Sequence, residues 1–448
     1  MKSSKLNPVT THKEFNGISG ALGITIGLPT LTVLFYLLCN QTYSIQGINV
    51  DFAKIKSQLP ITQDELWQLV FDKKCWSAYL AWFFILVVLD YLLPGKSLNG
   101  VKLRDGTVLN YKINGLSMSS LLIVLLLARL FQSNSDSSLE YYLPELQFIY
   151  DNQLQLIIIC FLFSFMLAVF VYIISFIPLA KPNGIGTKER ILSINGNTGN
   201  PFYDWFIGRE LNPRIGSWDI KLFCELRPGM LLWLLINLSC LHYQYHNLGY
   251  VTDSMIVVNL LQAFYIFDGV LNEEGCLTMI DITTDGFGFM LSFGDLAWVP
   301  WTYSLQARYL SIKGNEVNLG WTLSLLIVGL QALGFYIFRS ANKQKSDFRQ
   351  GKLPHLKSIQ TKTGSKLLVE GWWGLSQHIN YLGDWLIGLS WCLPTGFQTP
   401  LTYFYVIYFA SLLIHRQVRD EMKCRAKYGE DWEKYEKLVP YKIIPYVY

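Results

Sequence analysis

Charged side chains are scarce in this chain of 448 residues. Asp, Glu, Lys and Arg together make up 16% of it, whereas an average soluble domain carries about 25%. Hydrophobic residues make up 51%, and the mean hydropathy is +0.26. This balance excludes an ordinary soluble domain and indicates an integral membrane protein.

Patterns typical of other protein classes are also missing. The eight cysteines are scattered, mostly inside apolar runs, and form no CxxC pair, so we expect neither a disulfide framework nor a zinc site. His378 and His415 are not at metal-ligand spacing, and we expect no metal. No GxGxxG motif is complete, although 184–186 and 286–288 come near it. Any nucleotide must therefore bind among loops and helix ends rather than in a Rossmann domain.

What the chain has instead is a series of long apolar runs. Crossing about 30 Å of hydrocarbon takes roughly 20 apolar residues. Eight runs qualify, and two shorter ones, at 384–394 and 401–414, are too short to span alone. We predict an all-α polytopic membrane protein with about ten transmembrane helices. The eight longer runs lie at 18–39, 76–93, 114–131, 153–179, 229–246, 255–272, 287–305 and 318–339.

Loop charges orient these helices. The loop at 132–152 carries four acids, Glu140 among them, and no Lys or Arg, whereas both termini and the loops at 94–113, 180–228 and 339–370 are basic. With ten spans the basic segments share one side, which the positive-inside bias makes cytoplasmic. We expect no cleavable signal peptide and a short disordered cytoplasmic arm at 1–17. Alternating residues around Asp105-Gly106 predict a hairpin within 95–113.

Two polar segments each have two interpretations. In Gly199–Gly229 opposed charges are neighbours, so either ion pairs hold a loop against the membrane or the segment contacts substrate. The segment Phe267–Phe289 places carboxylates beside apolar spans, where they are costly unless paired or functional. Either these acids pair with arginines, or one of them keeps a raised pKa and donates a proton. The arginines considered are Arg209, Arg214 and Arg308, and Tyr265 on the same span is a further donor or relay.

The C-terminal third contains a third polar group. Lys345 and Arg349 are four apart and would share a helix face as a phosphate clamp, or form a basic collar attracted to anionic lipid. The Trp372-Trp373 pair and residues 415–448 add further cations and aromatic rings. Cations bind phosphates and flat rings stack on heterocycles. This combination favours a large anionic cofactor with an aromatic head.

These residues carry a resemblance. From about residue 13 to Tyr448 the chain resembles the membrane sterol reductases, a family that includes the sterol C-14, C-7 and C-24(28) reductases and the reductase part of lamin B receptor. The most specific stretches are Gly208–Gly229 and Leu413–Tyr448, and the opening Glu14–Ala21 with Leu28-Pro29 is similar to the fungal Δ14-sterol reductases.

The sequence departs from the family pattern at two positions. Asn16 stands where Gly is expected, and Gln377 stands where Arg usually precedes His378. The second departure puts a phosphate contact at position 377 in doubt. The basic head of lamin B receptor is absent, so no chromatin tether is expected.

The resemblance implies NADPH-dependent reduction of the C14=C15 bond of a sterol, in ergosterol or cholesterol synthesis in the endoplasmic reticulum membrane. It implies one membrane-embedded domain over 18–448, with the cofactor pocket mainly in 339–448. The sterol would enter from the bilayer; membrane lipids and other sterol-pathway enzymes are further expected partners, and nucleic acid is not. The residues that would hold NADPH or line its pocket are Lys345, Arg349, Trp373, Asn380, Arg416, Asp420, Lys427, Tyr428 and Tyr435.

The chemistry constrains the site further. An isolated alkene has no carbonyl to polarise it, so a proton must add first, at C15, and leave a tertiary cation at C14 that accepts hydride. The site therefore needs an acid and surroundings that tolerate transient positive charge. Tyr265 and Asp420 are the first candidates for the proton path, with Glu274 and Asp285 behind them. The alternatives are a C-24(28) or C-7 reductase, the much shorter isoprenylcysteine methyltransferases, and a non-catalytic sterol-binding scaffold.

Overall fold

The computed structural model describes residues 6–40, 49–60, 62–136 and 141–448. The chain forms two compact units. Unit 1 contains Met1–Ile45, Val50–Val251 and Gln262–Asn315, and unit 2 contains Gln46–Asn49, Thr252–Leu261 and Glu316–Tyr448. Glu140 of the predicted acidic loop and the first five residues of the predicted arm lie outside the described residues.

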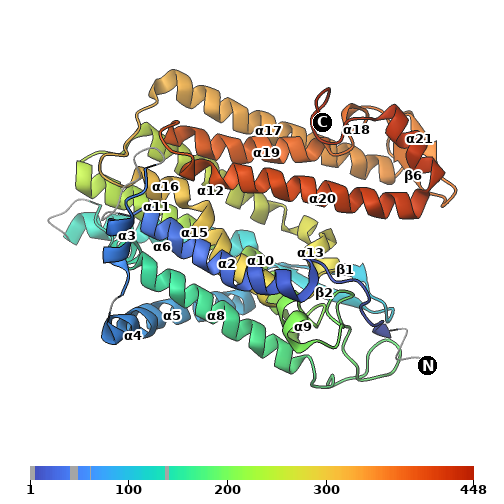
Figure 1. Ribbon diagram of the computed structural model, residues 1–448, viewed down its shortest axis with the longest axis horizontal. Helices are drawn as coiled ribbons and strands as arrows, with labels where there is room; N and C mark the ends of the chain where they lie inside the picture. The colour runs from blue at the N-terminus through green and yellow to red at the C-terminus, as the bar shows by residue number, and fades with distance from the viewer. Residues whose placement is uncertain (1–5, 41–48, 61, 137–140) are drawn as a thin grey trace. The chain divides into compact units, whose positions relative to one another are not determined.

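Unit 1 is a helical assembly with short two-stranded sheets (Figure 1). Its first half contains α2 (Gly17–Leu38), α3 (Phe52–Gln58), α4 (Gln63–Phe71), α5 (Lys73–Leu92), β1 (Lys96–Lys102), β2 (Val108–Ile113), α6 (Gly115–Asp136), α7 (Pro144–Asp151) and α8 (Gln153–Ile174). Its second half contains α9 (Pro201–Ile207), β3 (Arg214–Ile215), β4 (Trp218–Asp219), α10 (Ile220–Leu226), α11 (Pro228–Leu248), the larger part of α12 (Asp253–Leu271), η1 (Glu273–Thr278), α13 (Ile280–Thr283), α14 (Phe289–Phe293), the π-helical turn η2 (Gly294–Trp298), α15 (Val299–Tyr303) and α16 (Leu305–Leu310).

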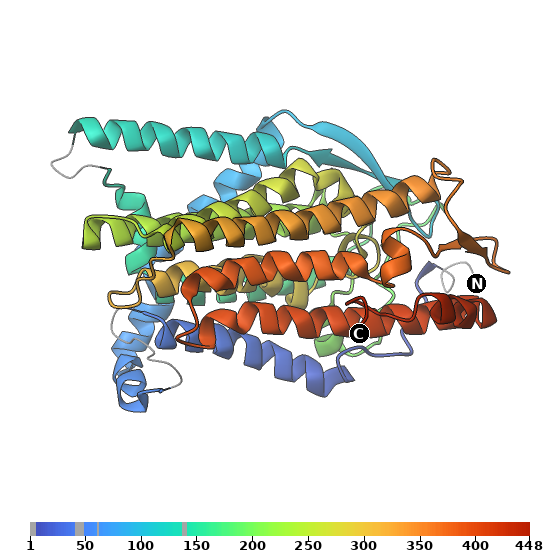
Figure 2. The same ribbon diagram turned by 90° about the horizontal axis from the view of Figure 1, so that it is seen from above.

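Unit 2 is built on three long helices that lie side by side in both ribbon views (Figures 1 and 2). These are α17 (Gly320–Arg349), α19 (Ile379–Cys392) and α20 (Phe404–Tyr428). The remaining elements are β5 (Ser358–Gln360), β6 (Lys366–Leu368), α18 (Trp372–Leu375), η3 (Leu393–Thr395), η4 (Leu401–Tyr403) and α21 (Glu430–Leu438).

Seven helices are long and apolar enough to cross a membrane, within the described residues. They cover seven of the eight longer predicted runs, and they establish a multi-pass α-helical membrane protein. The predicted span at 287–305 is the exception: α14, η2 and α15 follow one another with a π-helical turn in the middle. The run at 401–414 also differs, because α20 continues without a break into the polar tail as far as Tyr428. The expected count of ten spans is therefore not confirmed.

The predicted hairpin is confirmed. β1 and β2 pair antiparallel, with Lys96 opposite Ile113 and Lys102 opposite Val108. Gly106 adopts φ +87° in the turn, a left-handed conformation that glycine takes without strain. The Asp105 carboxylate accepts hydrogen bonds from the Thr107 backbone N–H at 3.0 Å and its hydroxyl at 2.7 Å. This local hydrogen bonding closes the turn.

The predicted disordered arm is wrong from residue 6 onwards. The Asn7 side chain donates to the Arg190 carbonyl and accepts from the Leu192 N–H, both at 2.9 Å. The Thr10 N–H donates to the Asn197 carbonyl at 3.0 Å. Sequence polarity indicated disorder, but these polar groups are satisfied by the loop before α9.

Ion pairs organise the polar segments of unit 1. Arg227, 2% exposed at its side chain, donates to Asp90 at 2.9 Å and to Glu273 at 2.6 Å. The nitrogen that bonds Glu273 also donates to Asn114 Oδ1 at 2.7 Å. The Glu273 carboxylate accepts the Gly115 N–H at 2.8 Å, at the start of α6. One buried cation thus joins the end of α5, the start of α6 and the turn after α12 to the start of α11.

These contacts favour the ion-pair interpretation of Gly199–Gly229, where Arg214 also pairs with Asp219 at 2.9 Å. The partners expected for the acids of the segment Phe267–Phe289 need correction, because Glu273 pairs with Arg227 and Glu274 pairs with Lys96. Arg308, one of the arginines expected there, instead donates to the Trp301 carbonyl at 2.8 Å.

In unit 2, glycines allow the long helices to approach closely. A Cβ at Gly334 of α17 would lie 2.8 Å from the Gly383 carbonyl oxygen, and one at Gly383 of α19 would lie 2.7 Å from the Gly334 oxygen. A Cβ at Gly388 would lie 2.8 Å from the Tyr405 ring of α20. Helices in lipid associate through close packing at small residues. These three glycines therefore determine how α17, α19 and α20 pack.

Candidate cofactor and proton-donor sites

The predicted phosphate clamp lies on the last turns of α17. Because this helix continues unbroken to Arg349, Lys345 and Arg349 share one face. The Lys345 ammonium lies 3.7 Å above the centroid of the Trp373 ring, in cation–π geometry. Trp373 is buried, and its indole N–H donates to the Ala341 carbonyl at 2.8 Å. The indole is thereby fixed against α17, and it positions the Lys345 side chain.

Beside this clamp lies a polar group that connects α19 and α20. The Tyr381 hydroxyl donates to Asp420 Oδ2 at 3.2 Å. The Tyr381 ring stacks on His378 with centroids 4.8 Å apart and an interplanar angle of 19°. The positive charge of Arg416 and the negative charge of Asp420 both act on Tyr381, and Asp420 also interacts electrostatically with Lys345. Helix packing thus brings predicted cofactor residues of α17 and α20 together.

The protonation states of this group follow from burial. Burial lowers the pKa of His378 to about 4, and the Lys345 and Lys442 charges contribute to this shift, so the imidazole is neutral at pH 7. Burial raises the pKa of Tyr381, and the Asp420 carboxylate adds to the rise. Tyr381 is therefore a protonated hydrogen-bond donor. Tyr381 was not predicted as a site residue from the sequence, where the only signal was a tyrosine three residues after His378.

Two amides, Asn380 and Gln377, each keep a buried side-chain oxygen that has no hydrogen-bond partner among the described residues. Asn380 donates to Asn342 Oδ1 at 3.3 Å, while its own Oδ1 is buried without a hydrogen-bond partner among the described residues. Gln377 donates to the Val439 carbonyl at 2.8 Å, and its backbone N–H donates to the Tyr441 carbonyl at 2.9 Å. Gln377 thus anchors the C-terminal segment. This structural role is consistent with the expectation that position 377 does not contact a phosphate.

The other predicted cofactor residues form an aromatic group around α21. Tyr435 is buried and packs with Trp432 and Val439. Tyr428 stacks on Trp432 with centroids 6.3 Å apart, and the Lys427 ammonium lies 4.9 Å from the Tyr428 ring. Tyr435 therefore supports the fold of this end, whereas the exposed Lys427 is accessible to an anion.

The remaining catalytic candidates lie in unit 1. Tyr265, on α12, contacts the Trp233 ring at a centroid distance of 6.2 Å. Glu274 forms an exposed salt bridge with Lys96 at 2.5 Å. Asp285 is buried, and its backbone carbonyl accepts from the Lys221 ammonium at 2.7 Å. The Glu274 carboxylate is therefore neutralised by Lys96 at the surface.

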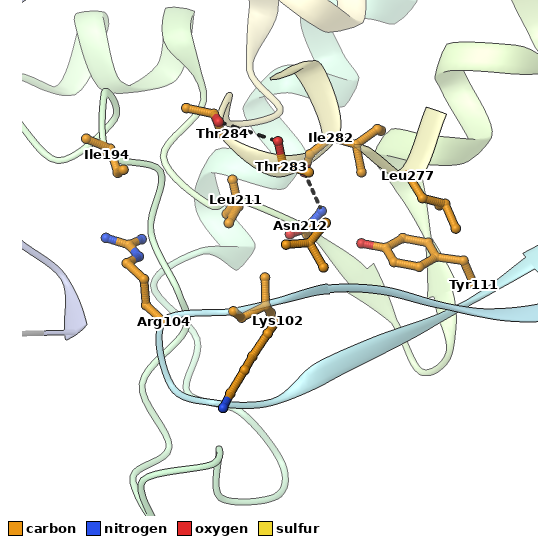
Figure 3. Close-up of a pocket in the computed structure, with 12 residues that line it drawn as sticks. Lys102, Arg104, Tyr111, Ile194, Leu211, Asn212, Leu277, Ile282, Thr283 and Thr284 are labelled. Carbon is orange, nitrogen blue, oxygen red and sulfur yellow. Dashed lines mark hydrogen bonds between the residues drawn. The ribbon is translucent and has the colours of Figure 1, made fainter. Parts of the chain in front are cut away.

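Unit 1 also has a pocket between the β1–β2 hairpin and the segment 277–284 (Figure 3). Asn212 at its wall donates to the Ile282 carbonyl at 3.3 Å, and the Thr283 and Thr284 hydroxyls are 3.5 Å apart. Residues from the hairpin, including Lys102 and Tyr111, line the opposite side. The residues predicted for catalysis or cofactor binding lie elsewhere than in the lining of this pocket.

The fold and these side chains define a class: a polytopic α-helical membrane protein whose unit 2 carries cations, rings and a carboxylate in one polar group. Residues 9–448 match the ergosterol biosynthesis ERG4/ERG24 family. The chain belongs to this family, and the predicted resemblance is confirmed.

Named relatives agree with this assignment. The chain is 99% identical to Delta(14)-sterol reductase ERG24 of Candida albicans over 448 residues, which is 100% of each protein. It is 58% identical to Delta(14)-sterol reductase ERG24 of Saccharomyces cerevisiae, with 99% of this chain and 100% of that protein covered. It is 42% identical to Delta(14)-sterol reductase LBR of Gallus gallus, with 97% of this chain and 64% of that protein covered.

Proposed function

We propose that this protein is a Δ14-sterol reductase, which reduces the C14=C15 double bond of a sterol intermediate in ergosterol synthesis with NADPH as reductant. The observation that carries the proposal is the full-length match to reductases of this name, from 99% identity in Candida albicans to 58% in Saccharomyces cerevisiae. A family match alone would leave the position of the double bond open.

The residues of unit 2 fit an anionic cofactor with aromatic rings. Lys345, Arg349, Arg416 and the exposed Lys427 supply cations for phosphates. The buried Asn380 Oδ1 is an unused acceptor that suits an N–H or O–H of a ligand. Tyr428 supplies a ring face, while the buried Trp373 lines the pocket by holding the Lys345 ammonium over its ring, and Tyr435 supports the group from the core. NADPH, when bound, supplies the hydride that the C14 cation accepts.

The chain's own residues must supply the proton and tolerate the cation. Tyr265 is our first candidate for the donor to C15, since a phenol remains protonated at neutral pH. Asp420 is the second candidate and acts with Tyr381, whose hydroxyl donates to it. Glu274 and Asp285 are the next candidates for the proton donor. Aromatic faces and carboxylates stabilise the positive charge that develops at C14.

We infer an endoplasmic reticulum membrane location, with both termini and the basic loops in the cytoplasm. The location is inferred from membership of the ergosterol biosynthesis family, and the orientation is supported by the distribution of Lys and Arg among the loops through the positive-inside bias. The apolar sterol then reaches the site from the bilayer, and NADPH from the cytoplasm. Other sterol-pathway enzymes are the protein partners we propose.

The test is to incubate the purified protein in nanodiscs with a 14-ene sterol and NADPH, and to resolve the sterols by gas chromatography with mass detection. We expect NADPH-dependent loss of the 14-ene with a gain of about two mass units, one hydride and one proton. Reduction of only a 24(28)-ene or a 7-ene would retain the family and refute the Δ14 assignment. Sterol binding without any reduction would favour a scaffold.

A further inference from the structure

A cluster of polar side chains lies in the apolar interior of unit 1, and its centre is Gln262 of α12. This side chain is fully buried. Its Oε1 accepts from the Trp233 indole N–H at 2.9 Å and from Asn237 Nδ2 at 2.6 Å. Its Nε2 donates to the Tyr303 carbonyl at 3.0 Å and to Gln306 Oε1 at 3.3 Å. All four hydrogen-bonding positions of the amide are therefore used.

The presence of a fully buried glutamine in the apolar interior of a membrane protein requires a physical explanation. A buried polar group left unpaired costs about 1–3 kcal/mol. A Leu or Met would fill this space without that possible cost. A saturated amide does what an apolar side chain cannot, because it fixes the direction of each donor it binds. Here the donor it fixes is a large ring.

That ring is the Trp233 indole, which is completely buried. Gln262 holds its N–H, and the Tyr303 ring meets it edge-on at 5.3 Å with an interplanar angle of 88°. On another side the indole contacts Tyr265, with centroids 6.2 Å apart and an angle of 54°. Gln262 and Tyr265 are three residues apart, so they also share a face of α12.

We propose that Gln262 is a positioning residue for Tyr265. It clamps the Trp233 indole, and the indole limits where the Tyr265 ring lies against a substrate. The inference rests on the proposed function, in which Tyr265 donates the proton to the sterol. Gln262 itself touches neither substrate nor cofactor in this scheme.

The main variant is Gln262→Met, which keeps the length of the side chain and removes all four hydrogen bonds. We expect kcat for the 14-ene sterol to fall by about 10- to 100-fold, because a misplacement of about 1 Å can reduce a rate 100-fold. KM should stay within about twofold, since the substitution removes no binding contact.

The chain offers a matched control in Gln331 of α17. This glutamine is also buried; its Oε1 accepts from the Trp391 indole at 3.0 Å and the Ser390 hydroxyl at 2.9 Å, and its Nε2 donates to the Leu261 carbonyl at 2.9 Å. Gln331→Met should lower thermal stability to a similar extent and leave kcat within about twofold of wild type. Equal losses of kcat in the two variants would overturn the proposal.

A double-mutant cycle separates positioning from packing. Tyr265→Phe removes the acid, and adding Gln262→Met to it should lower kcat no further, because the group that Gln262 positions is gone. Multiplying losses would refute positioning. If Gln262→Met does not fold, Trp233→Phe takes its place in the cycle, since it keeps an aromatic ring while it removes the N–H bond and part of the indole's packing surface.

Failure of the inference differs from failure of the proposed function. A wild-type rate in Tyr265→Phe, with the 14-ene still reduced, would overturn the role of Gln262 and leave the reductase standing. A wild-type protein that reduces no 14-ene sterol would overturn the proposed function itself.

Discussion

Replacing Arg227 by Met should destabilise unit 1 strongly. The guanidinium bonds Asp90, Glu273 and Asn114 at 2.9, 2.6 and 2.7 Å, and the side chains of Arg227 and Glu273 are 2% and 0% exposed. Without Arg227, two carboxylates remain away from water with no cation between them. Breaking a buried pair in this way costs about 3–5 kcal/mol.

The assay is thermal unfolding of the purified protein in detergent. An unfolding entropy of about 2.1 cal/mol/K per residue converts this loss to a Tm lower by about 3–5 °C for a chain of this length. Arg214→Met is the control, since Asp219 keeps its bond to the Leu222 N–H at 2.9 Å when Arg214 is removed. We expect the Tm of Arg214→Met to be lower than that of wild type by about 1 °C, which corresponds to a loss of about 1 kcal/mol in the free energy of unfolding.

A triple variant tests the cause of the loss. Asp90→Asn with Glu273→Gln in the Arg227→Met background removes both unpaired charges and keeps the shapes, so it should recover about half of the lost Tm or more. No recovery would show that the loss comes from the space left by the arginine. A Tm for Arg227→Met within about 1 °C of wild type, or equal to that of Arg214→Met, would refute the argument from buried charge.

Three further predictions concern unit 2. Lys345→Met should raise KM for NADPH by about 10- to 100-fold through loss of a charge-assisted phosphate contact, while Lys343→Met, at an exposed position, should stay within about twofold in the same steady-state assay. Because the pKa of His378 is about 4 in the folded protein and about 6.5 unfolded, the unfolded chain binds more protons below pH 6.5, so stability falls as pH drops from 6.5 to 4. This amounts to about 2–3 kcal/mol, and His378→Asn should flatten that part of the Tm-against-pH curve; an unchanged curve contradicts it. Gly334→Val should cost about 1–3 kcal/mol by driving α17 away from α19, whereas Gly329→Val, with no atom within 4 Å of an added Cβ, should leave Tm nearly unchanged.

Much of the architecture is local in origin and could be predicted. Seven of the apolar runs became helices long enough to span lipid, because a helix satisfies its own backbone hydrogen bonds. The hairpin at 95–113 formed where Asp105-Gly106 supplies turn chemistry. Lys345 and Arg349 share a face because i and i+4 meet on any helix.

The predictions that failed depended on neighbours distant in sequence. The arm at 6–16 is ordered because loop groups near 190–197 satisfy it. The run at 287–305 contains a π-helical turn, which no hydropathy pattern reveals. Arg227 pairs with Asp90, 137 positions away, and with Glu273, 46 positions away, and these separations hid the arginine that neutralises Glu273 after α12.

The sequence by itself determined the membrane class, the helices with their basic ends, and the cations and rings that favour an anionic cofactor, because these follow from composition and short-range periodicity. Only the tertiary structure decided which side chains meet. Tyr381 reaches Asp420, and Gln262 clamps Trp233, because helix packing joins residues 39 and 29 positions apart. Such contacts depend on how closely helices approach, as at Gly334 and Gly383, and that distance is a property of the packed helices rather than of either segment alone.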